Sequence, residues 1–416
     1  MILLTTSGHA PDVNIPLTDG SRGGTGHFRR FQQSDAASVP ACVIKIFYRD
    51  RTQPHTPSMR CMEHCLMPDS EDLPQPATRV ATQARPGAMA AVIGPCKPVA
   101  ETPSRPPILQ PTIFHQPWLL NIASDGTYRE ATVSSGGAVV GRLPYILFRK
   151  PSGHRVLGIP DLTHVLGPAI TVENGASHAT RSLRQFTITR DLIAQLPTAS
   201  HVGFRLHQGI TNTLAFEAAG FDTFVNYTVE IAPQPREVLW SQMRDKTRNV
   251  IRRAGERLTV VDLFDPERFI DFYERNLHER GLRNYHPRHL CVALVAECLR
   301  RGVGRILIAA DPSGNYKSGV FTIWDHQQEY YFMSTRTRDS HNGATSLLIW
   351  AAIQHAAMQG LTFNTDGLDS RSNVMLLTGF GGTIKPRLTV EKSSMTYALI
   401  RDIKRRLTPL TADTRG

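Results

Sequence analysis

The sequence predicts an α/β protein with a mixed α+β sheet, made of two tandem units behind a Pro-rich N-terminal extension. Three observations support this fold class. The 416 residues are 41% hydrophobic and 20% charged, an ordinary globular composition with room for two domains. Prolines crowd into the first quarter of the chain. After it, strand-like and helix-like patterns alternate, with short polar turns between them.

The first segment, residues 1–107, is predicted to be mostly disordered. Sixteen of the 28 prolines lie before Leu119, and thirteen of these fall between Pro54 and Pro117. Such density removes backbone donors and disfavours helical geometry at the preceding residues. Only Cys42–Tyr48 is strand-like. A translation start further along, for instance at Met89, would explain the same composition.

The segment Cys61-Met62-Glu63-His64-Cys65 superficially suggests a metal site. A structural zinc site needs about four ligands, and the only other candidates are the distant Cys42 and Cys96. We therefore expect a chance cluster and no metal. No stretch reaches the ~20 consecutive apolar residues of a membrane span, and the N-terminus does not resemble a signal peptide. The composition thus favours a cytoplasmic protein with reduced cysteines.

The first predicted unit covers residues 108–232. Two β-branched runs around a Gly-rich turn predict a hairpin over Ala131–Val133 and Ala138–Phe148. His154–Ile159 is a further strand candidate. A helix is plausible around Arg190–Gln195, and prolines at 233 and 235 close the unit.

The net charge of +11 is concentrated in two short segments. Residues 236–257 hold seven Lys or Arg against three Asp or Glu, and the basic tail, residues 401–416, holds five against two. We predict a basic linker helix over residues 233–257. It is either a solvated connection or an anion site, for cofactor phosphates or for tRNA.

The second unit, residues 258–400, has the clearest patterns. Asp265 and Pro266 are typical of a helix start, with Gly281 as its stop, and a second helix runs from Pro287 to Gly302. An antiparallel meander follows, and then an apolar helix and a strand that returns parallel to the last one. These elements are predicted at Ile306–Ala310, Ser318–Trp324, Tyr330–Thr335, Gly343–Gln359 and Leu361–Thr365.

The junction between Thr335 and Gly343 is the best candidate for binding an anion. A helix N-terminus presents unpaired N–H groups and a partial positive charge, which suits phosphate. Small residues let a ligand approach the backbone, and nearby arginines add donors. The predicted cofactor-binding residues are Arg336, Arg338, Asn342, Gly343, Ala344 and Thr345. The alternative is a surface loop in which Asn342 only caps the helix.

Several motifs resemble the Fem-related, peptidoglycan-bridge-like branch of the GNAT (acyl-CoA N-acyltransferase) superfamily. They span residues 111–400, and their order is more specific than any one of them. The motifs are Leu162-Thr163-His164-Val165-Leu166-Gly167-Pro168, Gly220-Phe221 through Tyr227-Thr228, Leu239-Trp240 with Lys246 through Ala254, Gly343-Ala344 with Leu347 through Ile353, and Asp366-Gly367 with Gly379-Phe380-Gly381-Gly382.

This resemblance implies two GNAT-like units in tandem, with acetyl-CoA or another acyl-CoA bound by the second as donor substrate. The family's phosphate-loop pattern has Gln or Arg three residues before its first Gly, and Gly or Ala in its last place. Here Ser340 and Thr345 occupy those two positions. The resemblance also implies an N-acyltransferase acting on a small molecule, an amino sugar or a cell-envelope precursor.

Transfer to an amine needs a group that removes its proton, because a lysine-like amine with pKa near ~10.4 is almost fully charged at pH 7. Asp366, at the end of the returning strand, is the preferred catalytic candidate, although Asp366-Gly367 could be a plain turn. Tyr331 and His341 are secondary candidates, with a core ring and a solvated loop residue as their alternatives. Gly379 to Gly382 is read as a tight turn under the substrate groove, or as a plain hairpin.

Two other functions remain open at this point. Fem-type enzymes use aminoacyl-tRNA as donor, so a tRNA-dependent aminoacyltransferase is the second candidate. Residues 233–257 are too short for the long helical arm that many of them carry. The third candidate is a catalytically degenerate module that binds nucleic acid or protein. Oligomeric state leaves no pattern in the sequence.

Overall fold

The computed structural model describes residues 109–171, 177–368 and 370–407, with side chains as far as residue 403. These residues all belong to one compact unit, residues 90–416. The predictions for residues 1–107 lie outside the described residues. These are the disordered extension, the strand at Cys42–Tyr48, the cluster at Cys61–Cys65 and the alternative start at Met89. Within the described ranges, no helix combines the length and apolarity of a membrane span.

The first half of the described chain alternates helices with strands. Its elements are η1 (Ile113–His115), α1 (Pro117–Ala123), β1 (Arg129–Ser135), β2 (Ala138–Arg149), β3 (Arg155–Gly158), β4 (Ala169–Ile170), α2 (His178–Ala194), β5 (His201–Arg205), α3 (Leu214–Ala218) and β6 (Asp222–Ile231). The predicted hairpin is confirmed as β1–β2, and the predicted third strand as β3. Helix α2 is much longer than predicted, since it begins where the side chain of Ser177 accepts from the N–H of Thr180.

The second half follows the predicted order of elements. Its elements are α4 (Arg236–Gln242), α5 (Asp245–Gly255), β7 (Thr259–Leu263), α6 (Pro266–Glu279), α7 (Arg288–Arg300), β8 (Gly304–Ala310), β9 (Tyr316–Trp324), β10 (Gln328–Arg336), α8 (Ala344–Met358), β11 (Thr362–Gly367), α9 (Arg371–Leu377), η2 (Thr378–Phe380), β12 (Thr383–Ser393) and α10 (Met395–Leu407). The side chain of Asp265 caps α6, and strands β8, β9 and β10 form the antiparallel meander. Strand β11 returns parallel to β10, as predicted.

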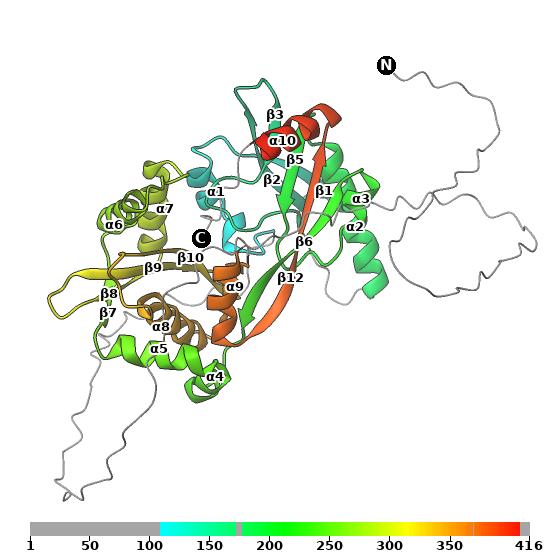
Figure 1. The fold of residues 1–416 in the computed structure, drawn as a ribbon. Helices are drawn as coiled ribbons and strands as arrows, with labels where there is room; N and C mark the ends of the chain where they lie inside the picture. Colours follow the sequence, from blue (N-terminus) through cyan, green and yellow to red (C-terminus); the bar gives the residue numbers. More distant parts are fainter. Residues whose placement is uncertain (1–108, 172–176, 369, 408–416) are drawn as a thin grey trace, which may run out of the picture. The chain divides into compact units, whose positions relative to one another are not determined.

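The described strands form one mixed sheet in which the two predicted units share their strands. Its order is β1-β2-β3-β5-β12-β6-β11-β10-β9-β8-β7, and β4 pairs with β2 beside it. Strand β12, from the end of the chain, lies between β5 and β6 of the first unit (Figure 1). Strand β6 in turn pairs with β11 of the second unit. The division into units at residues 108–232 and 258–400 therefore stays a prediction, because the shared sheet marks no boundary between them.

Two apolar cores cover the second half of the sheet on opposite faces. One core packs α6 and α7 against β8, β9 and β10, and it also takes in Ile113 and Phe114 of η1 and several residues of α1. The other packs α5 and α8 against the same strands. The chain before β1 thus helps to build the core of the second half, which fixes the first half close to β10.

The basic segment at residues 233–257 is two helices, not the one predicted. The chain turns at Arg244, whose N–H donates to the carbonyl oxygen of Gly379 (3.0 Å). Helix α5 buries Ile251 and Ala254 against α8. A Cβ on Gly343 would overlap the carbonyl oxygen of Val250, so the two helices pack in backbone contact. Helix α5 thus packs one face against α8, while its cations Lys246, Arg252 and Arg253 stay exposed.

Candidate active site

Strands β10 and β11 pair over only part of their length, and the stretch beyond this pairing is called the opening below. Their parallel pairing is limited to Gln328–Tyr330 and Thr362–Asn364. Beyond it, β11 pairs with β6 only, while β10 continues to Arg336 along β9. The register of β10 against β9 shifts between Tyr331 and Met333, so Phe332 is the extra residue of a bulge. The edge of β10 that faces the opening therefore has no partner strand there.

A loop from the first half brings His164 to this opening. Leu162, Val165 and Leu166 are buried in the core with α6 and α7, which anchors the loop on both sides of His164. The N–H of Leu166 also donates to the carbonyl oxygen of Arg205 at the end of β5 (2.7 Å). Apolar anchors on either side explain how a histidine comes to lie against the sheet.

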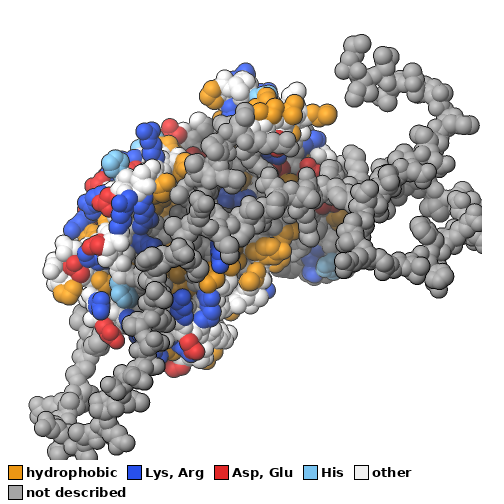
Figure 2. Space-filling view, viewed as in Figure 1, with side chains coloured by type: hydrophobic (Ala, Val, Ile, Leu, Met, Phe, Trp, Pro, Cys, Tyr) orange, Lys and Arg blue, Asp and Glu red, His pale blue; other side chains and the backbone are white. Residues whose placement is uncertain are grey.

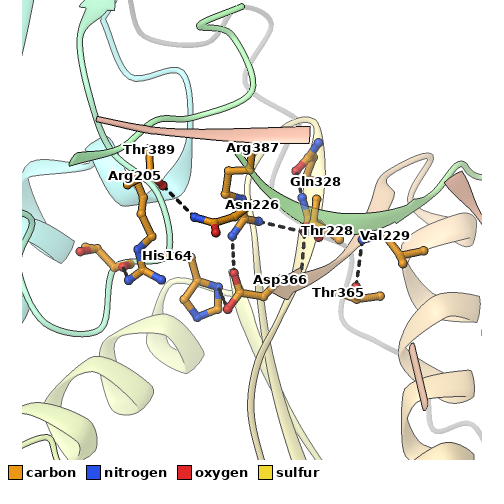
Figure 3. Close-up of polar contacts among 12 residues, drawn as sticks. His164, Arg205, Asn226, Thr228, Val229, Gln328, Thr365, Asp366, Arg387 and Thr389 are labelled. Carbon is orange, nitrogen blue, oxygen red and sulfur yellow. Dashed lines mark hydrogen bonds and ion pairs between the residues drawn. The ribbon is translucent and has the colours of Figure 1, made fainter. Parts of the chain in front are cut away.

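His164, Asp366 and Arg387 form a polar cluster at the end of β11. The side chains turn toward one another from the loop, from β11 and from β12 (Figure 3). Arg387 Nη1 donates to Asp366 Oδ1 (2.6 Å), and His164 Nδ1 lies 3.4 Å from Asp366 Oδ2. The His164 side chain is 13% exposed and that of Asp366 is 26% exposed. Three segments distant in the sequence thus supply one cluster.

Asn364 holds the backbone of β11 in shape beside this cluster. Its Oδ1 accepts from Thr228 Oγ1 (2.8 Å) and from the N–H of Asp366 (3.0 Å), and its Nδ2 donates to Gln328 Oε1 (2.9 Å). Asp366 has φ +63°, a left-handed conformation that costs free energy for residues other than glycine. The hydrogen bonds of Asn364 to three strands stabilise this strained position.

Burial and nearby charges set the protonation states of the cluster. Burial lowers the pKa of His164 to about 4; Asp366 opposes this, and Arg205, Arg387 and His286 add to it. Burial raises the pKa of Asp366, but His164, Arg387 and Arg205 outweigh it and lower the value to about 2. At neutral pH the cluster therefore holds a neutral imidazole beside a carboxylate.

The N-terminus of α8 is more occupied by the protein than the sequence predicted. The N–H of Gly343 donates to His341 Nδ1 (3.0 Å), and the N–H of Ala344 donates to the carbonyl oxygen of His341 (2.9 Å). Ala344 is fully buried, and Thr345 Oγ1 lies 3.0 Å from Ser318 Oγ. Asn342 is exposed, and its side chain does not cap the helix. The small residues thus serve helix packing, while no described residue accepts from the N–H groups of Thr345 and Ser346.

Three arginines lie close to this helix end. Burial lowers the pKa of Arg280, and the neighbouring cations Arg336 and Arg338 lower it further. Arg336 and Arg338 are exposed, and neither forms an ion pair with a described carboxylate. The nearby Asp339 is bound by Lys317 (2.7 Å). This end of β10 therefore carries uncompensated positive charge.

The remaining predicted residues lie around the opening in different ways. Tyr331 packs half-buried against the core with α8, and burial raises its pKa to about 12. Gly379 and Gly381 pack against Thr247 and Gln242, beside the start of α5. Sequence reasoning gave no role to His164, Arg205, Asn364 or Arg387. His164 was visible within one resemblance motif, but nothing local tied it to Asp366.

Comparisons with known proteins find one matching family model and several similar solved structures. Residues 241–365 match the family model described as "Acetyltransferase (GNAT) domain". No curated protein matches the chain. Among solved structures, the chain is similar to FemX, with a TM-score of 0.49 and 11% identity over 69% of this chain and 93% of that chain. It is also similar to L-PGS from Bacillus licheniformis, with a TM-score of 0.44 and 10% identity over 70% and 90%.

A third similar structure is a tandem GNAT protein from the clavulanic acid biosynthesis pathway, with a TM-score of 0.39 and 13% identity over 64% of this chain and 83% of that chain. The family model runs from the end of α4 into β11, so it includes the start of α8 and stops one residue before Asp366. Residues 241–365 therefore match a GNAT acetyltransferase domain, as the resemblance predicted for the second unit.

Proposed function

We propose that this protein transfers an acyl group from acyl-CoA to an amine acceptor. The observation that carries the proposal is the opening between β10 and β11, with an anion-binding end and a proton-handling end. Uncompensated arginines lie at one end, where β10 leads into α8. The His164–Asp366–Arg387 cluster lies at the other, where β11 ends. Acyl transfer from a phosphorylated thioester needs both kinds of site.

The donor's phosphates fit the end formed by Arg280, Arg336 and Arg338. Guanidinium groups bind phosphate through paired donors, and the N–H groups of Thr345 and Ser346 point from the positive end of a helix. Gly343 and Ala344 support this end by packing, and His341 orients it through the N–H of Gly343. In this proposal, Arg336, Arg338 and the N–H of Thr345 contact the phosphates. His341, Gly343 and Ala344 hold that end of the helix in place.

The thioester carbonyl fits the unpaired edge of β10. Backbone N–H groups that have no strand partner can stabilise the negative charge that develops on a carbonyl oxygen. Tyr331 lies on the same stretch of strand. Its raised pKa keeps it protonated at neutral pH, so its hydroxyl suits donation of a proton to the departing thiolate. Asp366 supplies a fixed negative charge near the acceptor amine.

The alternative donor, aminoacyl-tRNA, is less well supported. Over α6 and α7, arginine side chains are interspersed with acidic ones (Figure 2). There Arg288 pairs with Glu267 (2.6 Å), and Arg300 pairs with Glu297 (2.7 Å). Paired cations contribute little to binding a polyanion, which needs a continuous basic surface. A degenerate binding module would have no reason to retain the strained Asp366.

Isothermal calorimetry with acetyl-CoA, a longer acyl-CoA and bulk tRNA, each at two salt concentrations, tests the donor. We expect acyl-CoA to bind and to weaken only moderately with salt, because few phosphates are contacted. Binding of tRNA that falls steeply with salt, without binding of acyl-CoA, would favour the tRNA-dependent enzyme. Binding of none of the three would favour the degenerate module.

A further inference from the structure

We propose that His164 takes the proton from the acceptor amine during acyl transfer, and that Asp366 positions its imidazole. This inference rests on the proposed N-acyltransferase function and names its proton acceptor. It gives Asp366 a different role from the one expected for it, because the carboxylate then acts through the histidine. The argument uses the position of the ring, its hydrogen-bonding groups and the charges around it.

The imidazole lies against the bulge at the opening of the sheet. Its ring stacks on Phe332, with centroids 4.6 Å apart and an angle of 20° between the planes. Phe114 packs near the ring at 5.3 Å. Phe332 is the bulged residue where β10 leaves β11. The ring is therefore fixed next to the strand edge on which the thioester carbonyl is expected.

The ring nitrogens are poised for proton transfer and are not used in structural bonds. Nδ1 is buried and makes no hydrogen bond with a described residue, although Asp366 Oδ2 lies 3.4 Å away. A buried polar atom without a partner costs about 1–3 kcal/mol. With its hydrogen on Nδ1, facing the carboxylate, the neutral ring has its lone pair on Nε2. A small approach of the carboxylate on substrate binding would complete the Nδ1 bond.

A second buried histidine shows what a structural role looks like. His207 Nε2 lies 2.9 Å from the carbonyl oxygen of Pro168, and its Nδ1 accepts from the N–H of Gly209 (3.1 Å). Burial lowers the pKa of His207 to about 4, the value found for His164. The two residues thus differ in their partners, and His164 is also somewhat more exposed than His207. Only His164 faces a carboxylate and leaves a ring nitrogen unbonded.

The charged groups around His164 favour this division of roles. Asp366, Arg387, Arg205 and His286 all act on the ring. The pKa of Asp366, about 2, makes this carboxylate a weaker base than the imidazole. Arg387 holds its other oxygen. Asp366 therefore stays ionised throughout the pH range of activity and stabilises the imidazolium that proton transfer creates.

The chemical step balances without any further reactant. The neutral amine attacks the thioester carbonyl carbon, and a C–N bond forms. The proton on the attacking nitrogen moves to Nε2 of His164. The C–S bond then breaks, and its electron pair leaves with the thiolate of coenzyme A. Tyr331 protonates this thiolate, and the imidazolium returns its proton to the tyrosinate directly or through water, which restores both side chains.

Replacement of His164 tests the proposal directly. Wild-type turnover with acetyl-CoA and a panel of amines is measured first, since its absence would overturn the proposed function together with this inference. For His164→Gln we expect kcat to fall about 100-fold or more, the range typical of a lost general base, with unchanged calorimetric affinity for acetyl-CoA. His278→Gln, on the exposed end of α6, is the matched control. If the wild type turns over and His164→Gln keeps the same kcat, the inference about His164 is overturned while the proposed function stands.

The pH dependence of kcat/KM distinguishes a catalytic from a structural role, even if His164→Gln folds poorly. His164 works as a base only when it is neutral, so activity should rise with pH through its pKa. Arg205→Gln removes a cation that lowers this pKa, and the limb should move to higher pH. Asp366→Asn removes the anion that raises the pKa of His164. The acidic limb of the pH profile, measured on the residual activity, should therefore move to lower pH. If the acidic limb of the kcat/KM profile lies at the wild-type pH in both variants, the proposal is overturned.

Discussion

The two ends of the opening between β10 and β11 differ in their contact with water. Arg336 and Arg338 are exposed at one end, whereas His164 and Asp366 at the other are largely covered. Exposed charges can attract a phosphate but are screened by salt, while covered groups change their pKa and can exchange protons. The exposed end with the arginines is therefore suited to binding, and the covered end with His164 and Asp366 is suited to proton transfer. Substitutions at the two ends should therefore change different kinetic constants.

The largest effect should come from Asp366→Asn at the covered end. Asparagine tolerates the left-handed backbone and keeps the size of the side chain, so the change removes mainly the charge. We expect kcat to fall about 100-fold or more, because the imidazolium at His164 loses its counter-ion. The Kd for acetyl-CoA, measured by titration calorimetry, should stay within about twofold of the wild-type value. Asp191→Asn, on the surface of α2, is the control, and full activity of Asp366→Asn would remove the carboxylate from the mechanism.

A smaller effect is expected from Arg338→Ala at the exposed end. Loss of a charged hydrogen bond to phosphate should weaken acyl-CoA binding by about 1.5–3 kcal/mol, while kcat at saturation is kept. Titration calorimetry at low and high salt measures the change, which should shrink as salt screens the charge. Arg190→Ala, an exposed arginine paired with Asp191 on α2, serves as the control. Unchanged affinity in Arg338→Ala would show that the phosphates bind elsewhere.

A further effect, on stability and not on turnover, should appear against acid and only for the covered end. The pKa of His164 is about 4 in the folded protein against an ordinary value of 6.5, so the unfolded chain binds the extra proton between these values. Stability should therefore fall as pH falls from 6.5 to 4, by about 1.4 kcal/mol per pH unit for this residue. Urea unfolding at pH 7, 6 and 5 should show a shallower loss in His164→Gln than in wild type.

Arg338→Ala provides the matching control, since Arg338 is exposed and is not among the groups that act on the His164 ring. Its unfolding free energy should follow the wild-type dependence on pH. His207 and His115 have lowered pKa values as well, so part of the acid sensitivity remains in every variant. A slope that His164→Gln leaves unchanged would contradict the buried, neutral state assigned to His164.

Local patterns predicted the elements around the opening but not the cluster within it. Helix stops at Gly281 and Gly302, the cap at Asp265 and the meander of strands all depend on neighbouring residues in the chain. The order of strand, helix and parallel strand around α8 followed from the same reasoning. The signals for β5, β6, β7 and β12 were missed, because these strands are largely defined by pairing partners far away in the sequence.

The candidate site needed the tertiary structure for the same reason. Asp366 was found because a carboxylate ends a strand next to a helix start, which is a local feature. His164 and Arg387 meet it only because β12 lies between β5 and β6 and because apolar neighbours anchor the loop of His164. Gly343 was read as space for a ligand, whereas it makes room for Val250 of α5. A small residue in the sequence looks the same whether a ligand or a neighbouring helix packs against it.

The most direct test of the account is a steady-state comparison of wild type, Arg338→Ala and His164→Gln with acetyl-CoA as the varied substrate. The account predicts that Arg338→Ala raises KM for acetyl-CoA about 10- to 100-fold and keeps kcat, in line with its binding energy. It predicts that His164→Gln lowers kcat at least about 100-fold and keeps this KM. The same change in both variants, or the two changes exchanged, would contradict the division of the opening into a binding end and a chemical end.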